Sequence, residues 1–357
     1  MTFSAITGQA LPYIVLGFVA AALVAFVVTP FIARYVRSQK ILDHPDERRV
    51  HDRPVARGGG VAVVIAFVLV GGAIVLFDGL PATAESRGVE PANLYGLFIG
   101  GILAAVFGAI DDRLDLRARW QFFGQILLAA VAVLSGITVA YIGNPFGAGL
   151  IQFAIPVGIA FTVIWIVGMI NSLNFIDGLD GLSSGIALIA AVTLGLLSLT
   201  IQVDQPLVAV LCFVLAGGLL GFLRWNFHPA VIFQGTAGVM FLGYTLSVLA
   251  ILGSAKVVVA LLVLAVPIID TFWVIVRRVS SGRSPFSPDR GHIHHRLLDV
   301  GLSHRTTVLL IYVVCATLGL MSLLVSSATG VLAFLGALIL FGAVAFALRH
   351  GPPAATP

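Results

Sequence analysis

Acidic side chains gather in a glycine-rich stretch, NSLNFIDGLDGLSSG, at residues 171–185. Asp177 and Asp180 lie three residues apart in it, and Asn171 and Asn174 precede them. The helix dipole favours a carboxylate in the first turn of a helix, so capping explains one of the two aspartates. Capping does not explain both aspartates together with both asparagines. The stretch is therefore a candidate functional site.

A second acidic cluster lies in AIDDRLDLRARW, residues 109–120, where Asp111 and Asp112 are adjacent. Adjacent carboxylates repel each other, and near a membrane surface they require a cation or a proton in compensation. In one interpretation Arg113 and Arg117 provide that charge. In the other, the carboxylates bind Mg²⁺ with a phosphate, because this ion typically uses one or two carboxylates plus substrate phosphate oxygens.

Four arginines and two histidines lie around a glycine triplet in DHPDERRVHDRPVARGGGVAV, residues 43–63. A positive anchor beside anionic lipid is one interpretation of this segment. A phosphate-binding collar is the other, because a glycine-rich helix start adds backbone N–H groups that point at an anion.

Histidines and arginines also lie close together in SPDRGHIHHRLLDVGLSHR, residues 287–305. No cysteine accompanies the histidines and each neighbouring basic residue favours an anion, so a zinc site is disfavoured. Imidazoles beside arginines suit a diphosphate or nucleotide phosphate, and a solvated basic loop is the alternative. Asp270, buried in an apolar run, is a further functional candidate, with Arg277 as its partner if its role is structural.

The composition indicates which elements position these segments. Hydrophobic residues make up 59% of the 357 residues and charged residues only 10%, whereas soluble proteins have about 25% charged residues. The mean hydropathy is +1.08. The chain is therefore predicted to be an all-α, polytopic integral membrane protein. Cys212 and Cys315 lie in apolar runs, so neither a disulfide nor a metal site is implied.

Uncharged runs long enough for a helical crossing predict about eleven transmembrane helices. The run between Arg119 and Asp177 would form a helix of roughly 85 Å at about 1.5 Å per residue, too long for one crossing, so GNPFGAG at 143–149 divides it. Gly330 divides the run 306–348 in the same way. The other spans are expected near 11–33, 59–77, 93–110, 182–203, 206–223, 237–254 and 257–276.

The basic residues predict the orientation of these spans. Of the 20 Lys and Arg residues, all but Arg87 and Lys256 fall on one face, and that face is expected to be cytoplasmic. The N-terminus is then outside and the C-terminus inside, and no cleavable signal peptide is expected. The predicted cytoplasmic loops lie near 34–58, 111–119, 172–181, 224–236 and 277–305, and every candidate segment above except the one with Asp270 overlaps one of them.

In this order, the segments RRVHDRPVARGGG, DDRLDL, NSLNFIDGLDGL, PIIDT and SPDRGHIHHRLL resemble the polyprenyl-phosphate N-acetylhexosamine-1-phosphate transferases of glycosyltransferase family 4. The likeness is to the WecA-type branch and more distantly to the MraY-type branch, since HIHH stands in place of three consecutive histidines. It implies one transmembrane transferase domain over 1–357. The implied reaction transfers a sugar-1-phosphate, with GlcNAc-1-phosphate expected first, from a UDP-sugar to undecaprenyl or another polyprenyl phosphate. UMP is released, and a cell-envelope polysaccharide is initiated.

The resemblance also implies roles for individual residues. Asp111, Asp112, Asp177 and Asp180 would be catalytic, with Asp111 acting either as a base or as a covalent nucleophile. Asp111, Asp112, Asp180 and position 236 would hold the metal, Mg²⁺ or Mn²⁺ in its place. The implied substrate-binding residues are Arg49, His51, Arg57, Asn171, Asn174, Arg290, His292, His294, His295 and Arg296.

The implied partners are a UDP-N-acetylhexosamine, a polyprenyl phosphate and the lipid bilayer, with a homodimer allowed and no nucleic acid expected. The implied location is a bacterial-type plasma membrane, with the active site at the cytoplasmic face. A transporter is disfavoured, because it would need charges near the bilayer midplane.

One position departs from the family pattern. Where family members typically show Gly-Asp-x-Gly-Ser, with the Asp as a magnesium ligand, residues 235–239 read GTAGV. Thr236 therefore replaces a charged ligand, a loss of several kcal/mol for the metal in a low-dielectric site. The alternatives are a relative that binds prenyl phosphate or scaffolds the pathway, an inactivated form, or an enzyme that recruits another carboxylate such as Asp112.

Overall fold

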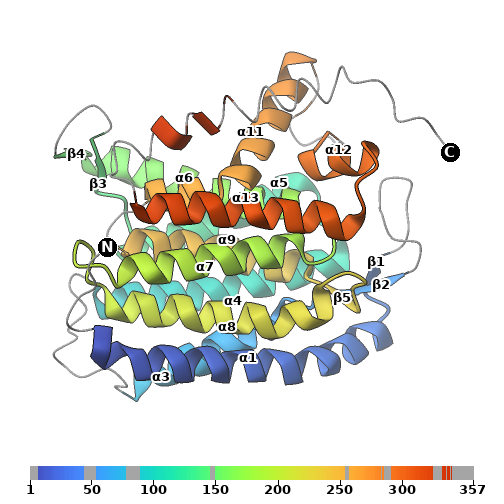
Figure 1. Ribbon diagram of the computed structural model, residues 1–357, viewed down its shortest axis with the longest axis horizontal. Helices are drawn as coiled ribbons and strands as arrows, with labels where there is room; N and C mark the ends of the chain where they lie inside the picture. The colour runs from blue at the N-terminus through green and yellow to red at the C-terminus, as the bar shows by residue number, and fades with distance from the viewer. Residues whose placement is uncertain are drawn as a thin grey trace.

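The computed structural model describes residues 7–43, 54–77, 89–144, 149–253, 257–282, 284, 291–324, 332–334, 336–337 and 339. Within them, long helices lie side by side (Figure 1). A helix lies at each predicted span up to residue 324. The helices are α1 (Thr7–Ser38), the continuous α2, η1 and α3 (Val61–Ala66, Phe67–Gly71, Gly72–Leu76), α4 (Pro91–Leu114), α5 (Ala118–Leu134), α6 (Ile155–Ile176), α7 (Leu182–Ser198), α8 (Pro206–Asn226), α9 (Gly235–Leu252), α10 (Val257–Val263), α11 (Ala265–Ser280), α12 (Ile293–Asp299) and α13 (His304–Leu324).

Six of the described helices are long and apolar enough to cross a membrane: α1, α4, α6, α8, α9 and α13. The helix Val61–Leu76, α5 and α7 are apolar but shorter. These lengths agree with an integral membrane protein. The count of about eleven crossings and the orientation of the termini remain predictions, and most of the span predicted after Gly330 lies outside the described residues.

Two breaks between helices can be compared with the prediction. The division at GNPFGAG is confirmed, because α5 and α6 are separated by strands β3 (Tyr141–Gly143) and β4 (Leu150–Gln152), which pair antiparallel. Within the span predicted over 257–276 the helix is not continuous, because it is interrupted at Leu264 between α10 and α11. Pro267 lacks the N–H that would bond to the carbonyl of Val263, so a continuous helix would lose that bond.

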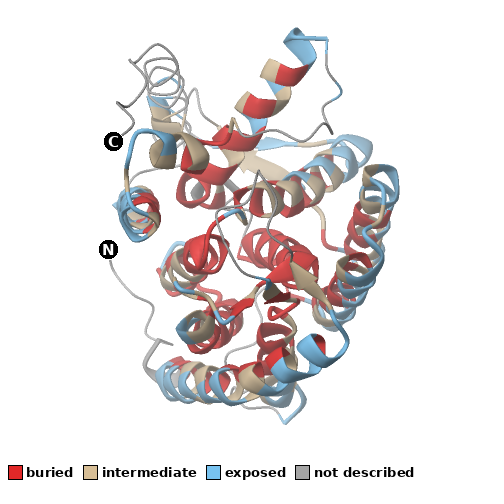
Figure 2. Cartoon of the chain, turned by 90° about the vertical axis from the view of Figure 1, so that its right-hand side faces the viewer, coloured by how far each residue is buried: buried red, intermediate tan, exposed pale blue. Residues whose placement is uncertain are grey.

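Helix α9 forms the centre of the bundle, and every one of its residues is buried. Buried residues concentrate on the inward faces of the surrounding helices (Figure 2). Glycines allow close approach to α9: a Cβ on Gly108 of α4 would lie 2.5 Å from Ala237 Cα. A Cβ on Gly243 of α9 would lie 2.5 Å from Ile170 Cα in α6. Small residues at such contacts are typical of helices that pack within membranes.

A small sheet connects loops at one end of the helices. Strand β2 (Val55–Arg57) pairs antiparallel with β1 (Leu42–Asp43) and parallel with β5 (Ile232–Phe233). In the register Arg57 lies opposite Phe233. The sheet therefore joins the segment after α1 to the segment that leads into α9, at the right-hand end of Figure 1.

Candidate active site

A cavity of about 270 Å³ lies at this end of the bundle. It is close to the lower limit of typical small-molecule pockets, about 300 Å³. Side chains reach it from β1, β2, β5, both ends of the α6–α7 turn, the ends of α8 and α9, α12 and α13. The described lining residues are Asp43, Arg57, Asn174, Asp177, Gly178, Leu179, Asp180, Asn226, His228, Phe233, Gly235, Thr236, His295 and His304.

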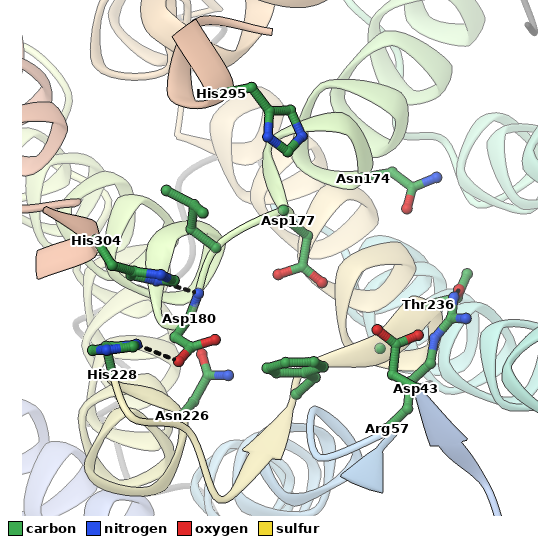
Figure 3. A pocket seen from close by; sticks show the side chains of 14 residues that line it. Asp43, Arg57, Asn174, Asp177, Asp180, Asn226, His228, Thr236, His295 and His304 are labelled. Carbon is green, nitrogen blue, oxygen red and sulfur yellow. Dashed lines mark hydrogen bonds and ion pairs between the residues drawn. The ribbon is translucent and has the colours of Figure 1, made fainter. Parts of the chain in front are cut away.

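Asp177 and Asp180 both line this cavity, in the turn between α6 and α7. Asp177 lies between the His228–His304 pair on one side and Arg57 with Thr236 on the other (Figure 3). Its Oδ1 accepts a hydrogen bond of 2.5 Å from the hydroxyl of Ser183. Burial raises the pKa of Asp177 to about 7, although the Ser183 hydrogen bond and the charge of Arg57 lower it. The carboxyl can thus gain or lose a proton near neutral pH.

Asp180 belongs to a cluster with two histidines. Its Oδ2 accepts a hydrogen bond from the backbone N–H of Ala230 (3.0 Å) and lies 2.7 Å from His228 Nδ1. Its backbone N–H donates to His304 Nε2 (3.0 Å), and the two imidazole rings stack with centroids 4.1 Å apart. Ligand atoms of the three residues lie within 4.8 Å of one another. Two imidazoles and one carboxylate suit a transition metal better than Mg²⁺.

Arg57 connects Asp112 and Thr236 at the other side of the cavity. Its Nε lies 2.8 Å from Asp112 Oδ1, and its Nη2 donates to Thr236 Oγ1 at 2.9 Å. Asp112 also accepts the backbone N–H of Thr236 at Oδ1 (2.8 Å) and that of Ala237 at Oδ2 (3.0 Å). Asp112 therefore caps the N-terminus of α9, where backbone donors and the helix dipole favour an anion.

Asp111 and Asn171 point elsewhere, and neither is among the described residues that line the cavity. Asp111 is buried, and its Oδ1 accepts hydrogen bonds from the Leu116 backbone (3.1 Å) and from Gln121 Nε2 (2.8 Å). It thereby closes the turn between α4 and α5. Asn171 donates from Nδ2 to Gln125 Oε1 at 2.6 Å. That bond joins α6 to α5.

The histidine segment, 287–305, contributes His295 and His304 to the described cavity lining. His292 Nδ1 lies 2.7 Å from Asp270 Oδ2, and Asp270 Oδ1 accepts the backbone N–H of Ile293 at 2.9 Å. Asp270 therefore caps α12 and orients His292. His294 packs against Gly178, where a Cβ would lie 2.4 Å from its Nε2. Burial lowers the pKa of His294 well below its usual value, and the charges of the neighbouring histidines lower it further.

The remaining predicted substrate-binding residues divide into two groups. Arg49, His51 and Arg290 lie outside the described residues. Arg296 lies in α12 and is not among the described cavity-lining residues. The assigned catalytic and binding roles stay predictions.

Several lining residues were missed by the sequence analysis, namely Asp43, Asn226, His228 and His304. Asp43 and His304 lie inside two of the candidate segments, 43–63 and 287–305, but had no role of their own there. Asn226 and His228 lie in RWNFHPA, just after the apolar run 206–223. Polar residues at the end of a predicted span, in a loop on the same face as the other candidates, are candidate site residues just as the arginines there are.

The oxygen atoms at the cavity fit a magnesium ion on the Asp177–Asp180 wall. Within the described part of the chain, hydrogen bonds reach Oδ1 of Asp177 and Oδ2 of Asp180, which leaves one carboxylate oxygen of each residue for a cation. Both oxygens of Asp112 are already bonded to Arg57 or to α9. Mg²⁺ typically takes one or two protein carboxylates and completes its shell with phosphate oxygens and water.

Comparison with known proteins identifies the family. The profile of glycosyl transferase family 4 matches residues 94–254. The chain is 37% identical to a Mycolicibacterium smegmatis decaprenyl-phosphate N-acetylglucosaminephosphotransferase, over 86% of this chain and 81% of that protein. It is 34% identical to a Bacillus subtilis protein named probable undecaprenyl-phosphate N-acetylglucosaminyl 1-phosphate transferase, over 88% and 86% of the two chains. A Yersinia pestis undecaprenyl-phosphate alpha-N-acetylglucosaminyl 1-phosphate transferase is 29% identical, over 82% of this chain and 80% of its own. With this similarity along most of its length, the chain belongs to glycosyl transferase family 4.

Proposed function

We propose that this protein transfers GlcNAc-1-phosphate from UDP-GlcNAc to a polyprenyl phosphate and releases UMP. The names of the relatives support the donor and the acceptor. The single observation that carries the proposal is the cavity, in which the acidic pair Asp177 and Asp180 faces Arg57 and histidines at one end of apolar helices. The impaired-relative alternative rests on Thr236 alone, and nothing in the described residues adds to it.

The cavity suits the meeting of two phosphate-bearing substrates. Phosphoryl transfer depends mainly on positioning and on neutralising charge. The guanidinium of Arg57, 29% exposed at its side chain, would bind phosphate oxygens while remaining paired with Asp112.

We propose Mg²⁺ as the cofactor, with Mn²⁺ able to replace it. Oδ2 of Asp177 and Oδ1 of Asp180 would bind the ion. When bound, it would neutralise negative charge on the diphosphate of the donor. This assignment moves the proposed metal site away from Asp111 and Asp112, whose described hydrogen bonds stabilise the ends of α4 and α9.

We also propose that the cavity opens at the cytoplasmic face of a plasma membrane, with about eleven crossings and the N-terminus outside. The distribution of Lys and Arg supports this orientation.

Purified protein in lipid nanodiscs tests the function. We expect UMP release from UDP-GlcNAc only when undecaprenyl phosphate and Mg²⁺ are both present, and loss of release in Asp177→Asn. Asp299→Asn, which changes an exposed carboxylate of α12, is the matched control and should keep the parental rate. Absence of UMP release from the parent protein would contradict the proposed function.

A further inference from the structure

A buried polar network lies behind the cavity wall and is centred on Gln234, between β5 and α9. The Gln234 side chain is fully buried. Its amide contacts the hydroxyl of Ser183 (3.1 Å) and that of Ser184, both in the first turn of α7. Ser183 also contacts Asp177 Oδ1 (2.5 Å), and Ser184 contacts Asn226 Oδ1 (2.6 Å). One amide thus connects to two side chains that line the cavity.

The number of hydrogens decides how this network is arranged. With Gln234 Oε1 facing the serines, each serine hydroxyl contacts two acceptor oxygens. One is Gln234 Oε1, and the other is Oδ1 of Asp177 for Ser183 or Oδ1 of Asn226 for Ser184. Each hydroxyl has only one hydrogen to donate. Two contacts would then lack a hydrogen. In the same arrangement Gln234 Nε2 is buried and has no hydrogen-bond partner among the described residues.

Rotating the amide by a half turn removes the first defect and lessens the second, and the amide oxygen and nitrogen have nearly the same shape, so the side chain still fits. The two N–H groups then donate to Ser183 and Ser184, and each serine donates its own hydrogen onward. An unpaired buried carbonyl then takes the place of an unpaired buried NH₂, and a buried carbonyl without a partner is better tolerated than a buried N–H group without one. Gly238 leaves the space for this side chain, since a Cβ there would lie 2.5 Å from Gln234 Cγ.

We propose that Gln234 is a positioning residue, whose amide donates to Ser183 and Ser184 so that these hydroxyls donate to Asp177 and Asn226. Donation to Oδ1 of Asp177 holds that oxygen against α7 and leaves Oδ2 toward the cavity. Asn226 is held from both sides, because its Nδ2 donates to the carbonyl of Ile232 at 3.0 Å. The network therefore fixes two side chains of the cavity wall, Asp177 and Asn226, from one buried amide. Figure 3 shows these two side chains at the cavity.

A double-mutant cycle tests the proposal, which rests on the proposed function for its kinetic readout. The variants are Gln234→Met, Ser183→Ala and the double variant, with Ser198→Ala as control. Ser198 is a buried serine of α7, the helix that contains Ser183, and its hydroxyl donates a hydrogen bond to the carbonyl of Leu194. The measurements are kcat for UMP release in nanodiscs and Tm by intrinsic fluorescence.

Because the two residues act in one chain of hydrogen bonds, their effects should not add. We expect each single variant to lower kcat about tenfold, the effect of one lost hydrogen bond at a reacting group, and the double variant to fall no further. The Tm of the double variant should likewise equal that of the less stable single variant, and Ser198→Ala should keep the parental kcat. A roughly hundredfold loss in the double variant, with additive losses of Tm, would overturn the proposal. So would parental kcat in Gln234→Met. An inactive parent protein would count against the proposed function alone, since the Tm cycle still tests the network.

Discussion

Replacing Thr236 by aspartate introduces the carboxylate that the family pattern has at this position, and the structure predicts the result. The group formed by Arg57, Asp112 and Thr236 has no net charge, because Arg57 is paired with Asp112 and Thr236 is neutral. In Thr236→Asp two carboxylates would share one guanidinium. We expect the variant to be less stable than the parent protein when divalent cations are removed, and to recover when Mg²⁺ is added.

The magnitude follows from the contacts of Arg57. Thr236 Oγ1 lies 2.9 Å from Nη2, and Asp112 Oδ1 lies 2.8 Å from Nε. A carboxylate at position 236 would stand about 4 Å from Asp112, where like charges repel by about 4 kcal/mol at an effective dielectric constant of about 20. Attraction to Arg57 offsets most of this, while burial of the new charge opposes the variant. The expected net loss in free energy of unfolding is about 2 kcal/mol.

Thermal unfolding in detergent, with excess EDTA or with saturating MgCl₂, measures the effect. An ion at 100 times its Kd adds about 2.7 kcal/mol, enough to reverse the loss. Thr236→Asn is the matched control, because it has the shape of aspartate without the charge. The reasoning would be refuted if both variants were equally stable in EDTA, or if Mg²⁺ raised the Tm of both by the same amount.

Two further predictions concern Asp177 and Asp270. The pKa of Asp177 is raised by burial to about 7, above the value of about 3.9 in an unfolded chain, so the folded state binds the extra proton between these values. The stabilising contribution of the Asp177 proton is complete below about pH 4 and is lost as the pH rises through 7. Asp177→Asn should therefore flatten the dependence of Tm on pH between these values. An unchanged curve would contradict a raised pKa for Asp177. Asp270→Asn should lower the free energy of unfolding by about 1–3 kcal/mol, because it breaks the buried contact with His292 and weakens the cap of α12. Chemical denaturation measures the loss, with Asp299→Asn as control, and an equal effect of the two substitutions would show that the Asp270–His292 contact contributes nothing.

Much of the fold was accessible from the sequence, because hydropathy is a local property. The apolar runs correspond to helices up to residue 324, and the turn signal GNPFGAG lies between α5 and α6. The interruption at Leu264 was missed because the spans were defined by uncharged runs, and a proline such as Pro267 does not break such a run. Asp177 and Asp180, predicted as site residues from their glycine-rich stretch, both line the cavity.

The partners of the other candidate residues were not accessible in this way. Asp270 has His292 as its described partner at 2.7 Å, a contact between residues 22 positions apart. Asp112 contacts Thr236 across 124 positions. Such contacts depend on how helices pack, and no periodicity or spacing along the chain encodes them.

The sequence by itself determined the class of protein, because the composition is apolar and charges are costly in lipid. It also predicted which segments do phosphate chemistry and that they gather on one face. Only the tertiary structure decided which carboxylates reach the cavity. Asp111 and Asp112 are neighbours in sequence, yet one closes the α4–α5 turn and the other caps α9. Successive side chains on a helix point about 100° apart, so adjacent aspartates meet different surroundings once the helices pack.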